Sequence, residues 1–300
     1  MNVGVLGGGR MGAGIAHAFL MTGNDVVVIE RDEEMADAAA SRIHESVARS
    51  LTRSAAPQTP QPQTTQKQAP QQPTPQQPTA EQLTKKLHVG TDFALFADRD
   101  LAIEAVPENR ALKRDALTRV ERVLAGKAVL ASNTSSISID DLATSLTRPE
   151  RFLGLHFFNP VPSSTLVEVV TGSATDADVI ERARGWVEML TKAAIIVRDS
   201  PGFASSRLGV ALALESIRML ETGVASAEDI DRAMELGYRH PMGPLRTTDV
   251  VGLDVRLGIA EELHANLGAR FEPPALLRRL VAEGKLGRKS GEGFYRWDNR

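Results

Sequence analysis

A histidine and a glutamate occupy neighbouring apolar runs of this chain, "GLHFFNP" (154–160) and "TLVEVV" (165–170). If the two runs form a hairpin around "NPVPSS", its symmetry about Pro162 places His156 opposite Glu168. Cross-strand neighbours have Cβ atoms about 5 Å apart, which suits a carboxylate–imidazole hydrogen bond. Such a carboxylate fixes the tautomer and stabilises the imidazolium, as a general base requires; a surface His–Glu pair is the structural alternative.

A glycine-rich stretch near the start of the chain predicts a nucleotide site. "VGVLGGGRMGAGIAHAFL" holds Gly7-x-Gly9-x-x-Gly12 after a strand pattern and before a helix pattern. The glycines permit a tight turn and let the backbone approach a pyrophosphate, which then lies on the helix N-terminus at Met11. The next strand pattern, "DVVVIE", ends in Glu30, where a ribose-binding carboxylate belongs. Three glycines in an ordinary strand–helix turn are the alternative.

Glu30 also bears on the choice of cofactor. Its carboxylate can accept hydrogen bonds from the adenosine 2′-OH and repel a 2′-phosphate, so we expect NAD rather than NADP. The adjacent Arg31 leaves NADP open, because a guanidinium can accommodate the phosphate. A comparison of kcat/KM for the two cofactors decides between them.

A polar cluster follows a later strand pattern, within "AVLASNTSSISI" (128–139). Polar groups at the carboxyl end of a parallel strand face the ligand crevice of such sheets. The candidate donors to cofactor or substrate oxygen atoms are Ser132, Asn133, Thr134, Ser135 and Ser136. Alternatively, Ser136 or Ser138 caps a short helix that contains "IDDLATSL".

The elements that must position these residues alternate along the chain. Short β-branched runs are separated by amphipathic helical stretches such as 109–124 and 176–191, which favours a parallel, doubly wound sheet. The predicted strands are "NVGVLG", "DVVVIE", "LAIEAV", "AVLAS" and "AAIIVRD". The predicted fold class is therefore α/β, with a Rossmann-type sheet.

Helical patterns alone follow the last of these strands. They are expected over residues 203–222, 226–236, 247–267 and 273–284. We therefore divide the chain into an NAD-binding domain, 1–198, and an all-helical C-terminal domain, 199–300.

One segment, "SAAPQTPQPQTTQKQAPQQPTPQQPTA" (54–80), consists almost entirely of Pro, Gln, Thr and Ala. Such a segment cannot join a packed core, so we predict a disordered or extended insert between helices over 33–52 and 80–88. A tolerated surface insertion is the simpler interpretation, and a ligand for a proline-recognising partner is the alternative.

Composition narrows the class of protein. Of 300 residues, 42% are hydrophobic, which is enough for two domains. The net charge of −3 with scattered basic residues predicts no nucleic-acid or membrane partner. The absence of cysteine excludes disulfides and thiolate metal sites and fits a reducing compartment. With no leader pattern and no apolar run approaching about 20 residues, we expect a cytoplasmic protein without a metal site.

Together, these stretches resemble the L-3-hydroxyacyl-CoA dehydrogenase family, which includes 3-hydroxybutyryl-CoA dehydrogenases. The resemblance covers nearly the whole chain except the insert. It rests on "GVLGGGRMGAGIA", "EAVPEN", "ASNTSS", "GLHFFNPVP…LVEVV", "DSPGF", "HPMGPLRTTDVVGLD" and "GRKSGEGFY". It implies an NAD-dependent oxidoreductase of fatty acid metabolism that acts on a short-chain 3-hydroxyacyl-CoA.

The resemblance also implies roles for individual residues. His156 would be the catalytic base, Glu168 its partner, and Ser135 the residue that binds the C3 oxygen of the substrate. Glu108 and Lys113 match family positions that contact the cofactor, alongside the candidate Asn133. The second domain resembles the family's helical domain, which implies a homodimer.

Two departures from the family pattern leave the substrate open. In "PGFASSRL", Ser206 stands where the family has an active-site asparagine, and serine lacks the paired donor and acceptor of an amide. The insert falls where the family has a helical hairpin that helps to hold CoA, although Lys85 and Lys86 could still pair with phosphates. A hydroxyacyl group on acyl carrier protein is therefore the alternative substrate, and a non-catalytic NAD-binding protein is the alternative outside enzymes.

Overall fold

A computed structural model describes residues 1–55 and 79–297. The chain divides into two compact units, Met1–Thr134 with Ile139–Arg198 and Ser135–Ser138 with Asp199–Arg300. Most of the predicted insert, 54–80, lies outside the described residues. No helix within the described ranges combines the length and apolar character that a bilayer span requires.

The first unit is built on one eight-stranded sheet, with strand order β3-β2-β1-β4-β5-β6-β7-β8. Its strands are β1 (Asn2–Leu6), β2 (Asp25–Ile29), β3 (Leu87–Gly90), β4 (Leu101–Glu104), β5 (Val129–Ser132), β6 (Phe152–Phe157), β7 (Leu166–Thr171) and β8 (Ala193–Arg198). Neighbouring strands are parallel except β6 and β7, which form an antiparallel hairpin. The α/β, Rossmann-type prediction is confirmed.

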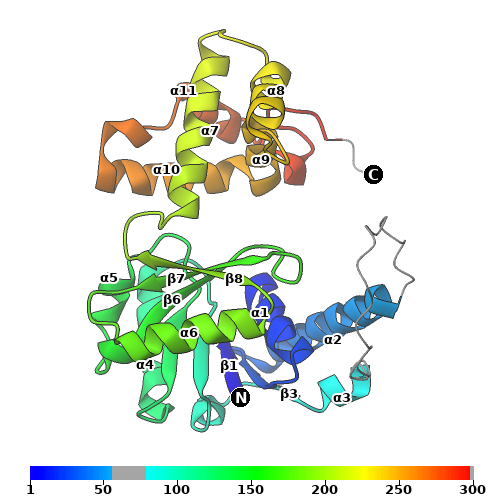
Figure 1. The fold of residues 1–300 in the computed structure, drawn as a ribbon, viewed down its shortest axis with the longest axis vertical. Coiled ribbons are helices and arrows are strands. Elements are labelled where there is room, and N and C mark those ends of the chain that lie inside the picture. Colours follow the sequence, from blue (N-terminus) through cyan, green and yellow to red (C-terminus); the bar gives the residue numbers. More distant parts are fainter. Residues whose placement is uncertain (56–78, 298–300) are drawn as a thin grey trace, which may run out of the picture. The chain divides into compact units, whose positions relative to one another are not determined.

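Helices connect these strands and cover the sheet. They are α1 (Arg10–Met21), α2 (Glu33–Ala55), α3 (Ala80–Thr84), α4 (Arg110–Val123), α5 (Ile139–Ala143) and α6 (Ala177–Met189). In Figure 1, α6 lies across the strands β6, β7 and β8 that it contacts. An apolar core of this unit joins the sheet to α1, α2 and α6.

The sequence patterns miss one strand of this sheet. The helix predicted over 80–88 ends at Thr84 in the structure, and Leu87–Gly90 instead form the edge strand β3, paired with β2. The preceding helix continues to Ala55 rather than ending at residue 52. A four-residue edge strand gives too short a periodic signal to be separated from the end of a helix.

The second unit is helical, as predicted. Its helices are α7 (Ser205–Glu221), α8 (Ala227–Tyr238), α9 (Pro244–Val251), α10 (Leu253–Leu267) and α11 (Ala275–Ala282). The single helix predicted over 247–267 is wrong, because α9 and α10 are separate. Gly252 between them has φ +108°, a conformation that no right-handed helix contains and that glycine adopts without strain.

The segment after α11 is fastened to this bundle by two buried aspartates. Asp249 accepts hydrogen bonds from the backbone N–H groups of Phe294 and Tyr295 and from Nε1 of Trp297. Asp231 accepts one from the Tyr295 hydroxyl at 2.7 Å. The end of the motif "GRKSGEGFY" is therefore hydrogen-bonded to α8 and α9.

Candidate active site

His156 and Glu168 are paired across the antiparallel strands β6 and β7. His156 Nδ1 lies 2.6 Å from Glu168 Oε2, and the two residues are buried, with 5% and 0% exposure. The predicted cross-strand pair is confirmed, and the surface alternative is wrong. Because Nδ1 faces a carboxylate, it donates the hydrogen bond, and Nε2 carries the lone pair of the neutral ring. This arrangement suits a general base.

The connection between β6 and β7 contacts Lys192, just before β8, and helix α1. Lys192, which precedes β8, donates hydrogen bonds to the backbone carbonyl oxygens of Val161, at 2.8 Å, and of Ser164. Val161 is buried against α1, where a Cβ added to Gly14 would lie only 2.9 Å from the Val161 Cβ. This packing joins the hairpin of His156 to the helix that follows the glycine-rich turn.

A buried ion pair lies at the carboxyl end of β4. Lys113 Nζ lies 2.8 Å from Glu104 Oε1 and 3.2 Å from Glu108 Oε2, and Lys113 is 1% exposed. Glu104 also accepts hydrogen bonds from the backbone N–H of Val106 and from the Ser132 hydroxyl. Burial raises the pKa of the Glu104 carboxyl, while Lys113 acts against that shift. Glu104 was not predicted from the sequence, although a glutamate within the apolar strand "LAIEAV" is the signal for such a pair.

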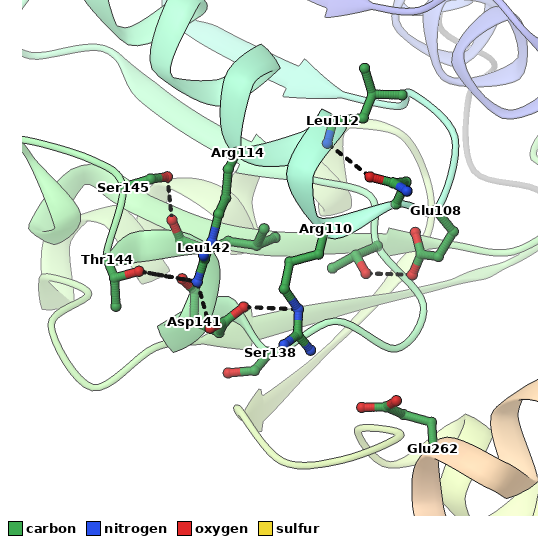
Figure 2. Close-up of polar contacts among 12 residues, drawn as sticks. Glu108, Arg110, Leu112, Arg114, Ser138, Asp141, Leu142, Thr144, Ser145 and Glu262 are labelled. Atoms are coloured by element: carbon green, nitrogen blue, oxygen red, sulfur yellow. Dashed lines mark hydrogen bonds and ion pairs between the residues drawn. The ribbon is translucent and has the colours of Figure 1, made fainter.

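Polar contacts continue from Glu108 to the loop after β5 and along α4. The Thr134 hydroxyl donates to Glu108 Oε1 at 2.6 Å. On α4, Arg110 and Arg114 both turn toward Asp141 of α5 and form ion pairs with its carboxylate (Figure 2). The beginning of α4 is therefore fixed to α5, and Glu108 just before it is fixed to the loop after β5 that carries the predicted polar cluster.

Besides Thr134, two more of the five candidate donors in that cluster make hydrogen bonds within the protein. Ser132 is fully buried, and its hydroxyl donates to Glu104. Asn133 Oδ1 accepts the backbone N–H of Phe157 at 2.9 Å, which ties the end of β5 to the end of β6. The sequence pattern placed both residues correctly at the carboxyl edge of the sheet but did not predict these inward contacts.

The glycine-rich turn fits a dinucleotide. Gly7 has φ +94°, and a Cβ on Gly12 would lie 1.7 Å from the Gly7 carbonyl oxygen, so neither position tolerates a side chain. A Cβ on Gly9 would meet nothing within 4 Å, which leaves open space beside the turn. Helix α1, with Met11 in its first turn, has no side-chain cap and no acidic residue there, so its N–H groups suit a pyrophosphate.

Two charged side chains flank Gly8 within this turn. Glu30 Oε1 accepts the Gly8 N–H at 2.7 Å, and Arg42 of α2 donates to the Gly8 carbonyl oxygen at 2.6 Å. The guanidinium of Arg31, which the sequence offered as a possible phosphate ligand, instead pairs with Asp32 at 2.9 Å. Arg42 thus contacts the glycine-rich turn. It lies 34 residues from Gly8 in the sequence, so no local motif predicts this contact.

Replacing Arg42 with alanine is expected to weaken NADH binding about 3- to 10-fold, because a charge-assisted hydrogen bond that fixes the turn is lost. Titration of NADH fluorescence against the purified protein measures this change. The matched control is Arg31→Ala, which removes an exposed guanidinium already paired with Asp32 and should leave NADH affinity unchanged. Equal affinities in both variants would show that Arg42 does not support the turn.

Ser135 and Ser206, the remaining predicted site residues, belong to the helical unit. Ser206 lies in the first turn of α7, which begins two residues after Phe203; Gly202 and Phe203 both have positive φ. Ser135 belongs to the short segment that groups with residues 199–300, and Ser138 of that segment donates to Asp199 at 2.6 Å. Their roles beside His156 stay predictions.

Comparisons with known proteins cover both units. The family model for the 3-hydroxyacyl-CoA dehydrogenase NAD binding domain matches residues 2–200, and the model for the C-terminal domain of the same family matches 202–297. The chain is 39% identical to a probable 3-hydroxybutyryl-CoA dehydrogenase of Deinococcus radiodurans, over 99% of this chain and 100% of that protein. It is 39% identical to a 3-hydroxybutyryl-CoA dehydrogenase of Mycobacterium tuberculosis, over 98% and 97%.

A solved structure agrees with these matches. The (S)-3-hydroxybutyryl-CoA dehydrogenase of Ralstonia eutropha is similar over 99% of both chains, with a TM-score of 0.87 and 33% sequence identity. The similarity therefore extends over both units rather than over the nucleotide-binding unit alone.

Proposed function

Because the chain belongs to the 3-hydroxyacyl-CoA dehydrogenase family, whose N-terminal domain binds NAD, we propose that it interconverts 3-hydroxybutyryl-CoA and acetoacetyl-CoA or close homologues. The observation that carries the proposal is the buried His156–Glu168 pair, on strands β6 and β7 of the same sheet whose β1 precedes the glycine-rich turn. A protein that only binds NAD has no need of a buried imidazole held by a carboxylate.

The residues divide the reaction between them. Gly7, Gly9, Gly12, Met11 and Glu30 hold the dinucleotide, which when bound accepts the hydride that leaves C3. His156 Nε2 takes the proton of the C3 hydroxyl, and Glu168 balances the positive charge that His156 then carries. The Ser135 hydroxyl donates a hydrogen bond to the C3 oxygen as that oxygen becomes a carbonyl. In the reverse direction, the imidazolium returns the proton to the same oxygen.

A spectrophotometric assay of NADH oxidation tests the proposal. Acetoacetyl-CoA is the first substrate, and the same acyl group on acyl carrier protein is the second. We expect turnover with the CoA thioester at a higher kcat/KM. Turnover with only the carrier-bound thioester would favour the second candidate, which Ser206 and the insert make reasonable. No turnover with either thioester would contradict the proposal.

We also propose that the protein forms a homodimer through its helical unit. Leu208, Leu236 and Tyr238 of α7 and α8 are more than two-thirds exposed, at 71%, 72% and 75%. Large apolar side chains that are exposed on a single copy suit an interface between copies. Light scattering of the purified protein measures the oligomeric state, and a monomer at micromolar concentration would contradict this proposal. The cytoplasmic location stays a prediction.

A further inference from the structure

Lys192, in the turn between α6 and β8, directs its ammonium group at backbone carbonyl oxygens rather than at a carboxylate. Its Nζ donates to the carbonyl oxygen of Val161 at 2.8 Å and to that of Ser164. Within the described ranges it has no ion-pair partner, and burial lowers the pKa of the ammonium. Withdrawing an ammonium from water without an opposite charge is unfavourable, so this lysine has a role other than charge pairing.

Both of its acceptors belong to the connection between β6 and β7, residues 158–165. The residue after Lys192 adds a third bond, because the Ala193 N–H donates to the Thr165 carbonyl oxygen at 2.7 Å. Three carbonyl oxygens of the connection therefore accept hydrogen bonds from two consecutive residues at the start of β8. The position of the connection over the sheet is set from this side.

The backbone just before Lys192 is strained. Thr191 has φ +56°, in the left-handed region that a β-branched residue rarely adopts. Its N–H donates to the Glu188 carbonyl oxygen at 2.8 Å, so the strained turn closes the end of α6, where glycine is the usual residue. Strain of this kind persists only where the surrounding structure maintains it, and it is concentrated at functional sites.

The connection also packs on the helix that follows the glycine-rich turn. Val161 is 2% exposed, and a Cβ on Gly14 would lie 2.9 Å from the Val161 Cβ, so α1 receives the connection at a position without a side chain. One turn further along α1, burial together with the positive charges of Lys192 and Arg49 lowers the pKa of His17 to about 4. Lys192 therefore acts where the connection meets α1.

The start of the connection contacts the imidazole of His156. The rings of His156 and Phe158 have centroids 4.6 Å apart and planes inclined by 49°. Glu168 holds the imidazole at Nδ1, at 2.6 Å, so the contact with Phe158 limits the remaining rotation of the ring and thus the direction of Nε2. A shift of the connection would move Phe158 while the pairing of β6 with β7 keeps Glu168 in place.

We propose that Lys192 is a positioning residue for His156, which it aims by holding the connection between β8 and α1. The inference rests on the proposed function, in which Nε2 of His156 exchanges a proton with the C3 oxygen. A general base acts only within hydrogen-bond reach of its proton, and a misplacement of about 1 Å can cost about 100-fold in rate. Lys192 has this effect without touching cofactor or substrate.

Replacing Lys192 with methionine tests the proposal, because it removes the three donors and keeps a side chain of similar length. We expect kcat for the reduction of acetoacetyl-CoA to fall about 10- to 30-fold through misalignment of the base. The KM for acetoacetyl-CoA and the Kd for NADH should each change by less than about twofold, since alignment in the transition state affects kcat alone. Lys192→Arg keeps donors at a similar reach and should return kcat to within about threefold of the wild-type value.

Arg182→Met is the matched control. Arg182 of α6 is also a partly buried cation that donates to a backbone carbonyl oxygen, that of Lys127 at 2.9 Å, before β5 begins. Both variants lose one such cation, and thermal unfolding records the stability that each loses. Only Lys192→Met should lower kcat per folded molecule. An equal fall of kcat in both variants, or a fall of Tm alone in Lys192→Met, would overturn the inference.

A second variant covers the case in which Lys192→Met does not fold. Gly14→Ala retains Lys192 but places a Cβ 2.9 Å from the Val161 Cβ, so it should push the connection away from α1 and lower kcat. If both changes act through one displacement, the double variant is no slower than the slower single variant. Wild-type kcat in folded Gly14→Ala, or losses that multiply in the double variant, would contradict the proposed linkage.

The two proposals fail in different ways. Absence of turnover with acetoacetyl-CoA in the wild-type protein would contradict the proposed function. Turnover in the wild-type protein with the same kcat in Lys192→Met would contradict only the role of Lys192.

Discussion

Replacing His156 with glutamine is expected to lower kcat about 10³-fold, within the range found when a general acid–base group is removed. Glutamine can still hydrogen-bond to Glu168, which is 2.6 Å from the imidazole, but it cannot take up a proton. The affinity for NADH should be unchanged, because the glycine-rich turn and Glu30 lie at other strands of the sheet. Steady-state assays with acetoacetyl-CoA and NADH fluorescence titrations measure the two quantities.

A matched pair of variants separates this role from a general loss of structure. His88→Gln changes an exposed histidine on the edge strand β3 and should leave kcat unaltered. Glu168→Gln should lower kcat about 10²-fold, because an amide does not stabilise the imidazolium. If the two residues act as a unit, the double variant is no slower than His156→Gln alone. Near-normal turnover in His156→Gln would disprove the assignment of the base.

The His–Glu pairing could be predicted from the sequence because it depends on the shortest periodicity in proteins. Side chains alternate strictly along a strand, so one assumption about the hairpin centre determined every facing pair, and the observed register agrees with it. The nucleotide site was predictable for a similar reason, since a positive φ at Gly7 and the close contact at Gly12 exclude other residues there. Local geometry leaves a sequence signature in both cases.

Features that depend on tertiary contacts were not predicted. The contact of Arg42 with Gly8 joins a residue of α2 to the glycine turn, and no local pattern records it. The break at Gly252 was hidden because the apolar spacing continues from α9 into α10. The buried position of Arg256 was likewise not recognised, since an arginine within an amphipathic pattern is ordinarily assigned to the solvent face.

Replacing Lys113 with methionine is expected to lower the free energy of unfolding by about 3–5 kcal/mol, as found when one member of a buried ion pair is removed. The variant leaves the fully buried Glu104 carboxylate without its cation, although Val106 and Ser132 still donate to it. Urea unfolding followed by fluorescence measures the change, and Trp186 of α6 reports on this unit. Lys85→Met is the matched control, because Lys85 and its partner Glu81 are 72% and 78% exposed, and it should cost less than about 1 kcal/mol.

The pH dependence of this loss distinguishes a missing charge partner from a packing defect. Burial raises the Glu104 pKa above the 4.5 of the unfolded chain, and removing Lys113 takes away the interaction that opposes the shift. The folded variant then binds a proton at Glu104 more tightly than the unfolded chain does, so its stability falls as pH rises above 4.5 and recovers as pH decreases toward it. The double variant Glu104→Leu/Lys113→Met removes both charges and should recover most of the lost stability at neutral pH. A loss that is the same at every pH, and that the double variant does not relieve, would mean that Lys113 contributes packing rather than charge.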